Sequence, residues 1–208
     1  TLGYKWVGTK GGGLLVFPPK EDHKPQIYHL QDHPRQTSSS DNIFTIMRDS
    51  KERMWISSFG GGLHLAEHRN GQLTFRQFLL EKDQQNMMRA MIQDQTGLIW
   101  VGSNDGVIVF NPDEFIKDET NYTNLYPDIE NQQSFNSNEV RVVYEDSHGH
   151  IWLGSTGGGL YLLIKKEPLK KSLFKHYNSD NGLSNEMVQA IQEDNEGNIW
   201  VSTESGIS

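Results

Sequence analysis

Short apolar runs separated by turn-forming residues extend along the whole chain, and they repeat. Four runs share one pattern, in which an apolar residue stands six positions before an Asp and another stands three positions before it. These runs are residues 42–49, 88–94, 140–146 and 188–194. Apolar segments of this length between turn signals are typical of buried β-strands. Gly and Pro interrupt every run before a helix could reach three turns, which argues against a helical solenoid of similar period.

The Asp that ends each run is predicted to cap a hairpin turn. These four residues are Asp49, Asp94, Asp146 and Asp194. In the last three a Gly follows three positions later, and an Asp that hydrogen-bonds its own backbone ahead of a Gly makes a tight turn. The first has Glu52 in place of the Gly, which predicts a turn that differs or is strained. The fixed place of each Asp favours a structural role over catalysis or metal binding.

A Trp-centred phrase follows each turn and organises the chain into repeats. Its five Trp residues are Trp6, Trp55, Trp100, Trp152 and Trp200. The phrase reads Trp-Leu-Gly-Ser-Thr-Gly-Gly-Gly-Leu from Trp152, and its copies are about 45 to 52 residues apart. Self-similarity at this period indicates a repeat architecture such as a β-propeller. A Trp recurring at one position of every repeat is expected in the core between repeats, in preference to stacking on a sugar.

Two further strands are expected after each Trp strand. The third strands are predicted at 14–17, 63–65, 107–110 and 160–163, and more polar fourth strands at 26–30, 73–78 and 173–177. Four antiparallel strands per repeat make the blade of a β-propeller. The Gly-Gly-Gly runs between the second and third strands lack the Lys and helix of a phosphate-binding loop, so turns are expected there.

The predicted fold is an all-β partial propeller of about four blades, which starts and ends within a blade. The approximate blades are 1–36 (incomplete), 37–84, 85–136, 137–180 and 181–208 (incomplete). Cut blade edges would expose apolar faces, so self-association is expected. Three arrangements stay open: residues 187–194 pair with the first Trp strand and close a ring, two chains form a homodimeric ring, or the arc stays open.

Composition excludes several classes of partner and site. A net charge of −8 argues against nucleic acid and against anionic lipid, both of which attract basic surfaces. The absence of Cys excludes disulfides and thiolate metal sites. No apolar run approaches the roughly 18 residues of a membrane span, so no membrane contact is expected from this segment. No cofactor is indicated.

The candidate ligand contacts lie five positions before the capping Asp residues. This position holds Phe44, Arg89, Arg141 and Gln189. It places a variable, mostly polar residue on an otherwise apolar inner strand, and inner strands line the central channel of a propeller. The two Arg residues and the Gln can donate hydrogen bonds to a hydroxyl-rich or carboxylate-bearing ligand. The alternative is that they solvate the channel or pair with one another. The preceding Asn86, Asn138 and Asn185 are expected to cap turns.

Other polar clusters give less support for chemistry. His148 and His150 flank a turn Gly and are expected to face solvent, so no metal site is predicted. No Ser/His/Asp set or carboxylate pair stands out from the repeats, so no catalytic residues are assigned. Residues 113–135 are interpreted as an insertion in the third blade. Its Tyr122 and Tyr126 could dock a neighbouring domain or a sugar, or the insertion could be variable decoration.

The repeated phrase resembles the two-component regulator propeller repeat, and residues 138–160 and 185–207 carry it most fully. Ser57 and Ser202 depart from it where the Gly after the Trp dipeptide is expected. That repeat builds sensor domains of Bacteroides-type hybrid two-component systems. The resemblance implies an extracytoplasmic, periplasmic sensor part of an inner-membrane histidine kinase, which recognises glycan-derived oligosaccharides and transmits the signal to further propeller and signalling domains. The kinase itself would lie outside this chain. The alternative is a non-signalling propeller, either a secreted carbohydrate-active enzyme or a protein-interaction scaffold.

Overall fold

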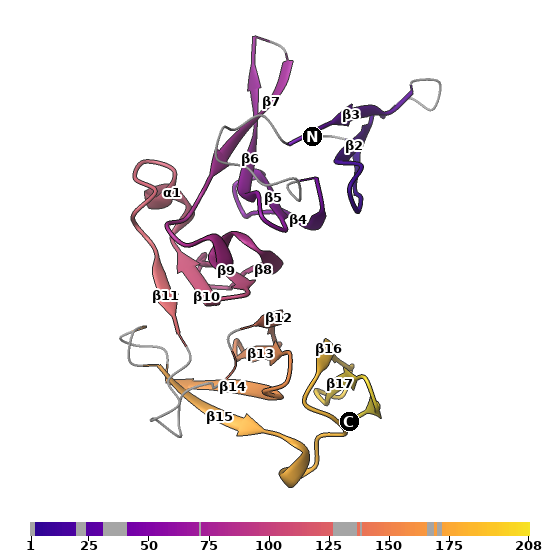
Figure 1. Ribbon diagram of the computed structural model, residues 1–208, viewed down its shortest axis with the longest axis vertical. Helices are drawn as coiled ribbons and strands as arrows, with labels where there is room; N and C mark the ends of the chain where they lie inside the picture. Colours follow the sequence, from indigo (N-terminus) through magenta and orange to yellow (C-terminus); the bar gives the residue numbers. More distant parts are fainter. Residues whose placement is uncertain are drawn as a thin grey trace. The chain divides into compact units, whose positions relative to one another are not determined.

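The computed structural model describes residues 3–19, 24–30, 41–70, 72–126, 137, 139–165, 169 and 172–208. The chain divides into two compact units, Thr1–Arg89 and Ala90–Ser208, and each is described by itself. Both units consist of antiparallel sheets, which Figure 1 shows with colours that follow the sequence. Among the described residues, no helix has the length and apolar character needed to cross a membrane.

The first unit holds a three-stranded and a four-stranded sheet, each with its strands in sequence order. The strands are β1 (Lys5–Gly8), β2 (Leu14–Phe17) and β3 (Gln26–Tyr28), then β4 (Ile43–Arg48), β5 (Met54–Ser58), β6 (Gly62–Arg69) and β7 (Gln72–Phe78). A short 3-10 helix, η1 (Asp83–Asn86), follows. β6 and β7 are far longer than β2 and β3. The β6–β7 hairpin is therefore longer than the strands of the first sheet.

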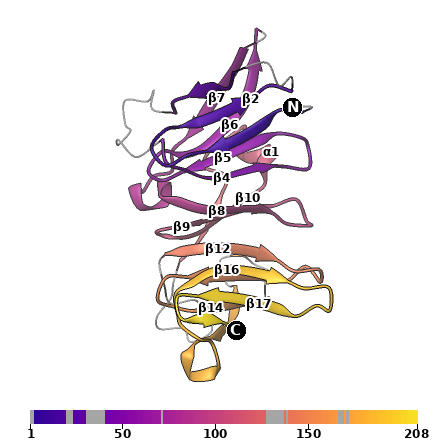
Figure 2. The ribbon, with the colours of Figure 1, turned by 90° about the vertical axis from the view of Figure 1, so that its right-hand side faces the viewer.

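The second unit holds two four-stranded sheets and a three-stranded sheet. The first sheet comprises β8 (Met88–Gln93), whose first two residues belong to the first unit, β9 (Ile99–Ser103), β10 (Gly106–Phe110) and β11 (Thr123–Leu125). The others are β12 (Val140–Glu145), β13 (Ile151–Ser155), β14 (Leu160–Lys165) and β15 (Leu173–Tyr177), then η3 (Ser179–Asn181), β16 (Val188–Glu193), β17 (Ile199–Thr203) and β18 (Gly206–Ile207). Figure 2 shows β12, β16 and β17 running side by side in this unit. The four-stranded antiparallel sheets confirm the all-β blade architecture.

The third blade corrects the sequence interpretation of residues 113–135. Over its described part this segment contains the helix α1 (Pro112–Phe115) and the blade's outer strand β11, which pairs with β10. Phe115 is fully buried and stacks on Phe110 with ring centroids 4.3 Å apart. Tyr122 packs edge-on against Phe115, whereas Tyr126 is exposed. The aromatic residues of this segment therefore serve mainly to close the blade; residues 127–136 lie outside the described part.

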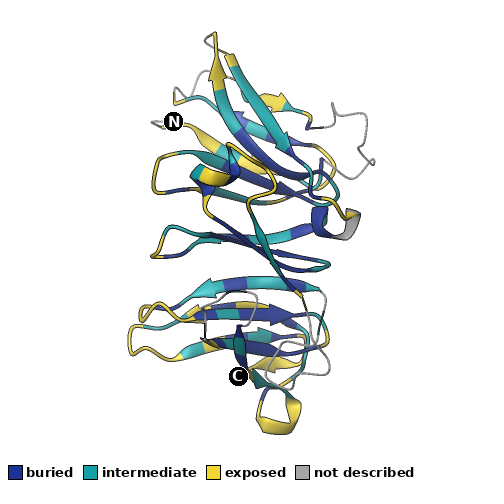
Figure 3. Ribbon diagram, turned by 90° about the vertical axis from the view of Figure 1, so that its left-hand side faces the viewer, coloured by how far each residue is buried: buried dark blue, intermediate teal, exposed yellow. Residues whose placement is uncertain are grey.

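The core forms between the faces of consecutive sheets (Figure 3). The middle strands β9 and β10 are buried throughout, whereas buried and partly buried positions alternate along β2. In the first unit, buried Leu14, Val16 and Ile56 form a cluster against which Trp6 packs. In the second unit, one cluster surrounds Trp100, and another lies against Trp152. Sheet faces that bury Val, Leu and Ile in this way supply the main favourable free energy of the fold.

Close packing between sheets explains the Gly after the Trp dipeptide. A Cβ on Gly102 would lie 2.6 Å from the carbonyl oxygen of Val140, and one on Gly154 would lie 2.5 Å from Val188 Cγ1. Because each Gly has no side chain, the first buried residue of the next inner strand can pack directly against its backbone. Ser57 occupies the same place in its repeat, is fully buried, and its Oγ has no hydrogen-bond partner among the described residues. An unpaired buried hydroxyl is costly, so this repeat is packed less favourably at that point.

The turn that has Glu52 in place of Gly keeps the backbone geometry of the other turns, but its backbone is strained. Glu52 has φ of 64°, in the left-handed region where Gly97, Gly149 and Gly197 lie in the other repeats. Its N–H donates to Asp49 O at 2.9 Å, as the N–H of Gly97 donates to Asp94 O at 2.8 Å. A left-handed non-Gly residue costs about 1–2 kcal/mol. The turn is therefore strained and not different in shape.

Candidate functional site

Each hairpin turn is closed by a carboxylate that also holds the Trp of its repeat. In the third repeat Asp94 Oδ1 accepts from the backbone N–H groups of Thr96 and Leu98 at 2.9 and 3.0 Å. Asp94 Oδ2 accepts from Trp100 Nε1 at 2.8 Å. The same Trp–Asp bond recurs from Trp55 to Asp49, from Trp152 to Asp146 and from Trp200 to Asp194. In the sequence each Asp stands six positions before its Trp, and this hydrogen bond joins those two residues.

The five Trp residues differ in burial. Trp55 and Trp100 are fully buried, whereas Trp200 is 51% exposed and so does not belong to a core in this structure. Trp6 and Trp152 are partly buried against neighbouring apolar clusters. Trp6 Nε1 is buried without a hydrogen-bond partner in the described part of the chain.

These hydrogen bonds lower the pKa of three of the turn carboxylates, those of Asp49, Asp146 and Asp194. Burial alone would raise the pKa of Asp49, but hydrogen bonds from Trp55 and Arg53 and the charge of Arg53 outweigh it and hold that pKa below its ordinary value. Burial likewise opposes a set of bonds from Trp152, His150 and His148 that lowers the pKa of Asp146. For Asp194 the bonds from Trp200 and Asn198 dominate and lower its pKa.

Acidification should therefore weaken the fold through these groups. Because the native pKa of Asp49 is depressed, this carboxylate stabilises the fold fully above its unfolded pKa of about 3.9 and loses that contribution as pH falls through the lower native value. We expect the Tm of the wild-type chain to fall more steeply between pH 5 and pH 2 than that of Asp49→Asn, each followed by circular dichroism. Parallel curves would contradict this account.

Of the three inner-strand residues predicted to contact a ligand, the two Arg residues interact with other side chains of the protein. The guanidinium of Arg89 lies over the ring of Phe59, 4.7 Å from its centroid, and 5.5 Å from that of Phe44. Arg141 Nε donates to Glu139 at 3.0 Å. Gln189 is exposed on β16. Arg89 belongs to the first unit and the other two to the second.

Two of the three Asn residues expected at turns lie in the described part. Asn86 accepts from Leu80 N at 2.8 Å and donates to Leu80 O at 3.1 Å. Asn185 accepts from Met187 N at 2.8 Å. Asn138 lies outside the described residues. Sequence reasoning missed Asp41, which stands eight positions before its turn Asp, as Asn86 does, and accepts from Leu30 N at 2.8 Å.

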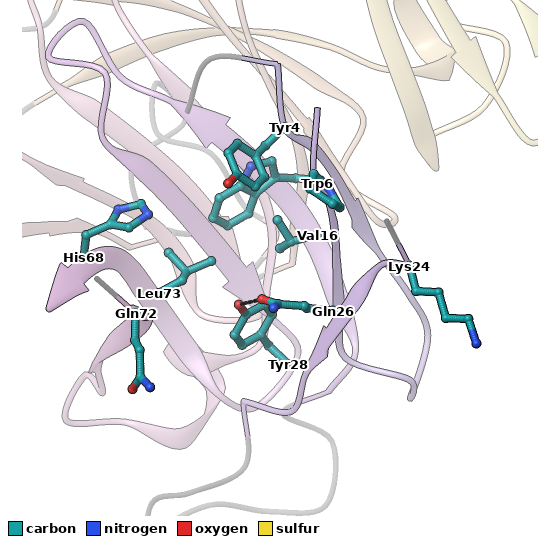
Figure 4. A pocket seen from close by; sticks show the side chains of 10 residues that line it. Tyr4, Trp6, Val16, Lys24, Gln26, Tyr28, His68, Gln72 and Leu73 are labelled. Carbon is teal, nitrogen blue, oxygen red and sulfur yellow. Dashed lines mark hydrogen bonds between the residues drawn. The ribbon is translucent and has the colours of Figure 1, made fainter. Parts of the chain in front are cut away.

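A cleft that the sequence did not indicate lies in the first unit, between its first sheet and the β6–β7 hairpin (Figure 4). Its volume is about 540 Å³. The lining includes one cationic side chain, Lys24, together with three aromatic and two amide side chains: Tyr4, Trp6, Tyr28, Gln26 and Gln72. Tyr28 donates to the Gln26 side chain. Burial first, and then neighbouring Tyr4, raise the pKa of Tyr28, so its hydroxyl stays protonated at neutral pH.

The wall formed by Tyr28 and Leu73 is shared with a second hollow of about 460 Å³. That hollow contains His64, which is 2% exposed, and neither of its ring nitrogens has a hydrogen-bond partner among the described residues. Burial lowers the pKa of His64 to about 4, against the opposing charge of Asp41. His64 is therefore neutral at pH 7, and its donor and acceptor nitrogens are both shielded from solvent. We call the two adjoining hollows the β3–β7 cleft.

Aromatic walls with a few polar groups are typical of sites for small organic ligands. Tyr28, Gln26 and Gln72 place a hydroxyl and two amides beside the aromatic walls, and such groups can exchange hydrogen bonds with ligand hydroxyls. The β3–β7 cleft thus suits a neutral, hydroxyl-bearing ligand with faces that can lie against aromatic rings.

Comparison with known proteins agrees with the repeat pattern. Residues 134–157 and 182–205 match the two component regulator propeller family. Histidine kinase P4 from Formosa agariphila is 24% identical over 178 residues, which are 81% of this chain but 12% of that protein. The chain therefore spans a small part of this relative.

Solved structures share the fold over almost the whole chain. The extracellular domain of a protein described as a hybrid two component system from B. thetaiotaomicron is 26% identical, with a TM-score of 0.73, over 99% of this chain and 25% of that one. Virginiamycin B lyase from Staphylococcus aureus, at 12% identity and a TM-score of 0.63 over 98% of this chain and 64% of the lyase, shows the fold alone. The chain is a β-propeller region in which two segments match two-component regulator propeller repeats, and its fold is similar to that of extracellular domains of Bacteroides two-component systems.

Proposed function

We propose that this chain is a ligand-sensing propeller region in the extracytoplasmic, periplasmic part of a membrane-bound hybrid sensor histidine kinase. The observation that carries the proposal is the in-phase repeat together with its likeness, over 99% of the chain, to a two-component extracellular domain. The region itself binds and transmits without catalysis. Phosphoryl transfer would belong to the remaining domains of the parent protein.

The ligand class follows from the β3–β7 cleft. Tyr4, Trp6 and Tyr28 supply aromatic faces, and Gln26 and Gln72 supply amides. This combination favours an oligosaccharide with few charges. The inner-strand residues Arg89, Arg141 and Gln189 are the second candidate for ligand contact, and they would favour an anionic sugar.

Titration calorimetry of the chain against neutral and uronic-acid oligosaccharides tests this proposal. We expect a neutral oligosaccharide to bind, and Gln72→Ala to weaken it because an exposed cleft amide is lost without harm to the core. His64→Leu should keep or raise Tm, because it removes two unpaired buried nitrogens, and should leave binding unchanged because neither nitrogen is open to the cleft. Arg141→Ala serves as the matched control and should bind as the wild type does.

The contrary outcomes separate the alternatives. If Arg141→Ala loses binding and Gln72→Ala keeps it, the ligand occupies the inner strands. If no oligosaccharide binds, ligand sensing by this region is wrong, whatever the parent protein does.

A further inference from the structure

The turn between β12 and β13 brings together three side chains that can ligate a metal ion. Asp146, His148 and His150 each offer one ligand atom, and these atoms all lie within 4.8 Å of one another. The two imidazole rings stack with centroids 5.9 Å apart and planes 22° apart. Both His residues are exposed, so an ion can reach them from solvent. We propose that this turn binds a first-row transition-metal dication such as Zn²⁺ through the two imidazoles.

The hydrogen bond between Asp146 and His150 prepares one of the two ligands. Asp146 Oδ2 lies 2.9 Å from His150 Nδ1. A carboxylate accepts, so in the neutral ring the proton sits on Nδ1 and the lone pair on Nε2. Metal-ligating His residues commonly have this arrangement, because the carboxylate fixes the ring and strengthens its basicity. His150 Nε2 is therefore the nitrogen whose lone pair is left for an ion.

Asp146 acts as a positioning residue, because its own oxygens are occupied. Its Oδ1 accepts from the backbone N–H groups of His148 and His150 at 3.0 and 2.9 Å, and its Oδ2 also accepts from Trp152 Nε1 at 2.9 Å. The ion would thus take two imidazole nitrogens and complete its coordination with water. Imidazole ligands favour Zn²⁺, Cu²⁺ and Ni²⁺ over Ca²⁺ and Mg²⁺, which prefer oxygen.

A second carboxylate adds negative charge beside the turn. Glu193 Oε1 accepts from Ser147 Oγ at 2.6 Å, and Glu193 Oε2 accepts from Ser147 N at 2.7 Å. Ser147 Oγ also lies 3.3 Å from His148 Nδ1. Like His150, His148 therefore has its Nδ1 next to a polar partner. An acidic neighbourhood of this kind attracts a dication.

The repeat itself supplies variants that keep the turn. The positions of His148 and His150 are held by Thr96 and Leu98 in the third repeat, and by Glu196 and Asn198 in the fifth. Those turns keep the same Asp–backbone bonds, so the geometry of the turn does not require His. His148→Thr and His150→Asn should accordingly remove the imidazoles without disturbing the hairpin.

Calorimetric titration with Zn²⁺, with Ca²⁺ as a second probe, tests the site. We expect one saturable Zn²⁺ site per chain and no saturable Ca²⁺ site. Each single variant should weaken Zn²⁺ binding by about 10- to 100-fold, the loss seen even for partners that only orient a ligand. The double variant should abolish binding and leave Tm in the absence of Zn²⁺ unchanged.

His29→Asn is the matched control. His29 Nδ1 lies 2.8 Å from Asp41 Oδ2, the same carboxylate pairing, but among the described residues His29 is in no group of three ligating side chains. This variant should bind Zn²⁺ as the wild type does. The proposal is overturned if the wild type shows no saturable Zn²⁺ binding, or if the double variant retains it.

Discussion

Gly102→Ala should lower the stability of the chain by about 3 kcal/mol, because overpacking of a tight contact costs 1–3 kcal/mol and here a rigid backbone atom is hit. The added Cβ would lie 2.6 Å from the carbonyl oxygen of Val140 and 3.2 Å from Val140 Cγ1. The backbone of an inner strand cannot yield without displacing its whole sheet. Chemical denaturation followed by Trp fluorescence measures the effect.

Ser57→Ala is the control, since Ser57 stands at the same position of its own repeat. A Cβ is already accommodated there, and the Ser57 hydroxyl is buried without a partner. Replacing it should leave stability unchanged or raise it slightly. If Gly102→Ala is tolerated as well as Ser57→Ala, close approach is not the reason for the repeated Gly.

Asp94→Ala should cost at least about 3 kcal/mol, because hydrogen bonds to a charged group contribute about 1.5–3 kcal/mol each and orphaned buried donors add to the loss. The variant leaves Trp100 Nε1 without its acceptor at a fully buried position, together with two backbone N–H groups of the turn. Asp94→Asn keeps an acceptor for the backbone groups but offers only one oxygen, so an intermediate loss is expected. Denaturant midpoints of the two variants give the comparison.

Asp194→Ala makes the same chemical change at an exposed copy of the turn. Trp200 is half exposed, so its released N–H and those of the turn are taken up by water. The loss should be clearly smaller than for Asp94→Ala. Equal losses at the two sites would show that burial of the Trp–Asp bond does not set its contribution.

The strand pattern of this chain could be predicted because each blade carries the same local signals. The apolar positions before each Asp, the Asp turn and the Trp strand all fall within one repeat, and the structure places strands at each of them. The third blade's outer strand was missed because Thr123–Leu125 is short and polar, without the alternation that marks a half-exposed strand. The helix before it also separates it from the rest of its blade.

Side-chain contacts and burial were less accessible to sequence reasoning. The spacing of Asp and Trp was visible, but the bond between Trp100 Nε1 and Asp94 Oδ2 needs side-chain geometry. Burial of Trp55 and exposure of Trp200 depend on which neighbouring strands cover each Trp, and the phrase around the Trp does not encode that.

The β3–β7 cleft arises from residues that no local motif links. Tyr28 and Leu73 come from strands far apart in the chain. The cleft lies between the first sheet and the longer strands of the β6–β7 hairpin. His64 lies on an otherwise apolar stretch of β6, and the sequence alone does not show that its ring is buried without hydrogen-bond partners. His148 and His150 were visible as His-Gly-His in the sequence, which predicted no metal site there. Their closeness to Asp146, on which the proposed site rests, follows from the turn.

The most direct test of ligand sensing by this region is a crystal structure of the chain with the neutral oligosaccharide that binds best in calorimetry. The account predicts sugar in the β3–β7 cleft, with a ring against Trp6 or Tyr28 and a hydroxyl within hydrogen-bond distance of Gln26 or Gln72. Sugar bound instead at Arg141 and Gln189, with the cleft empty, would contradict it.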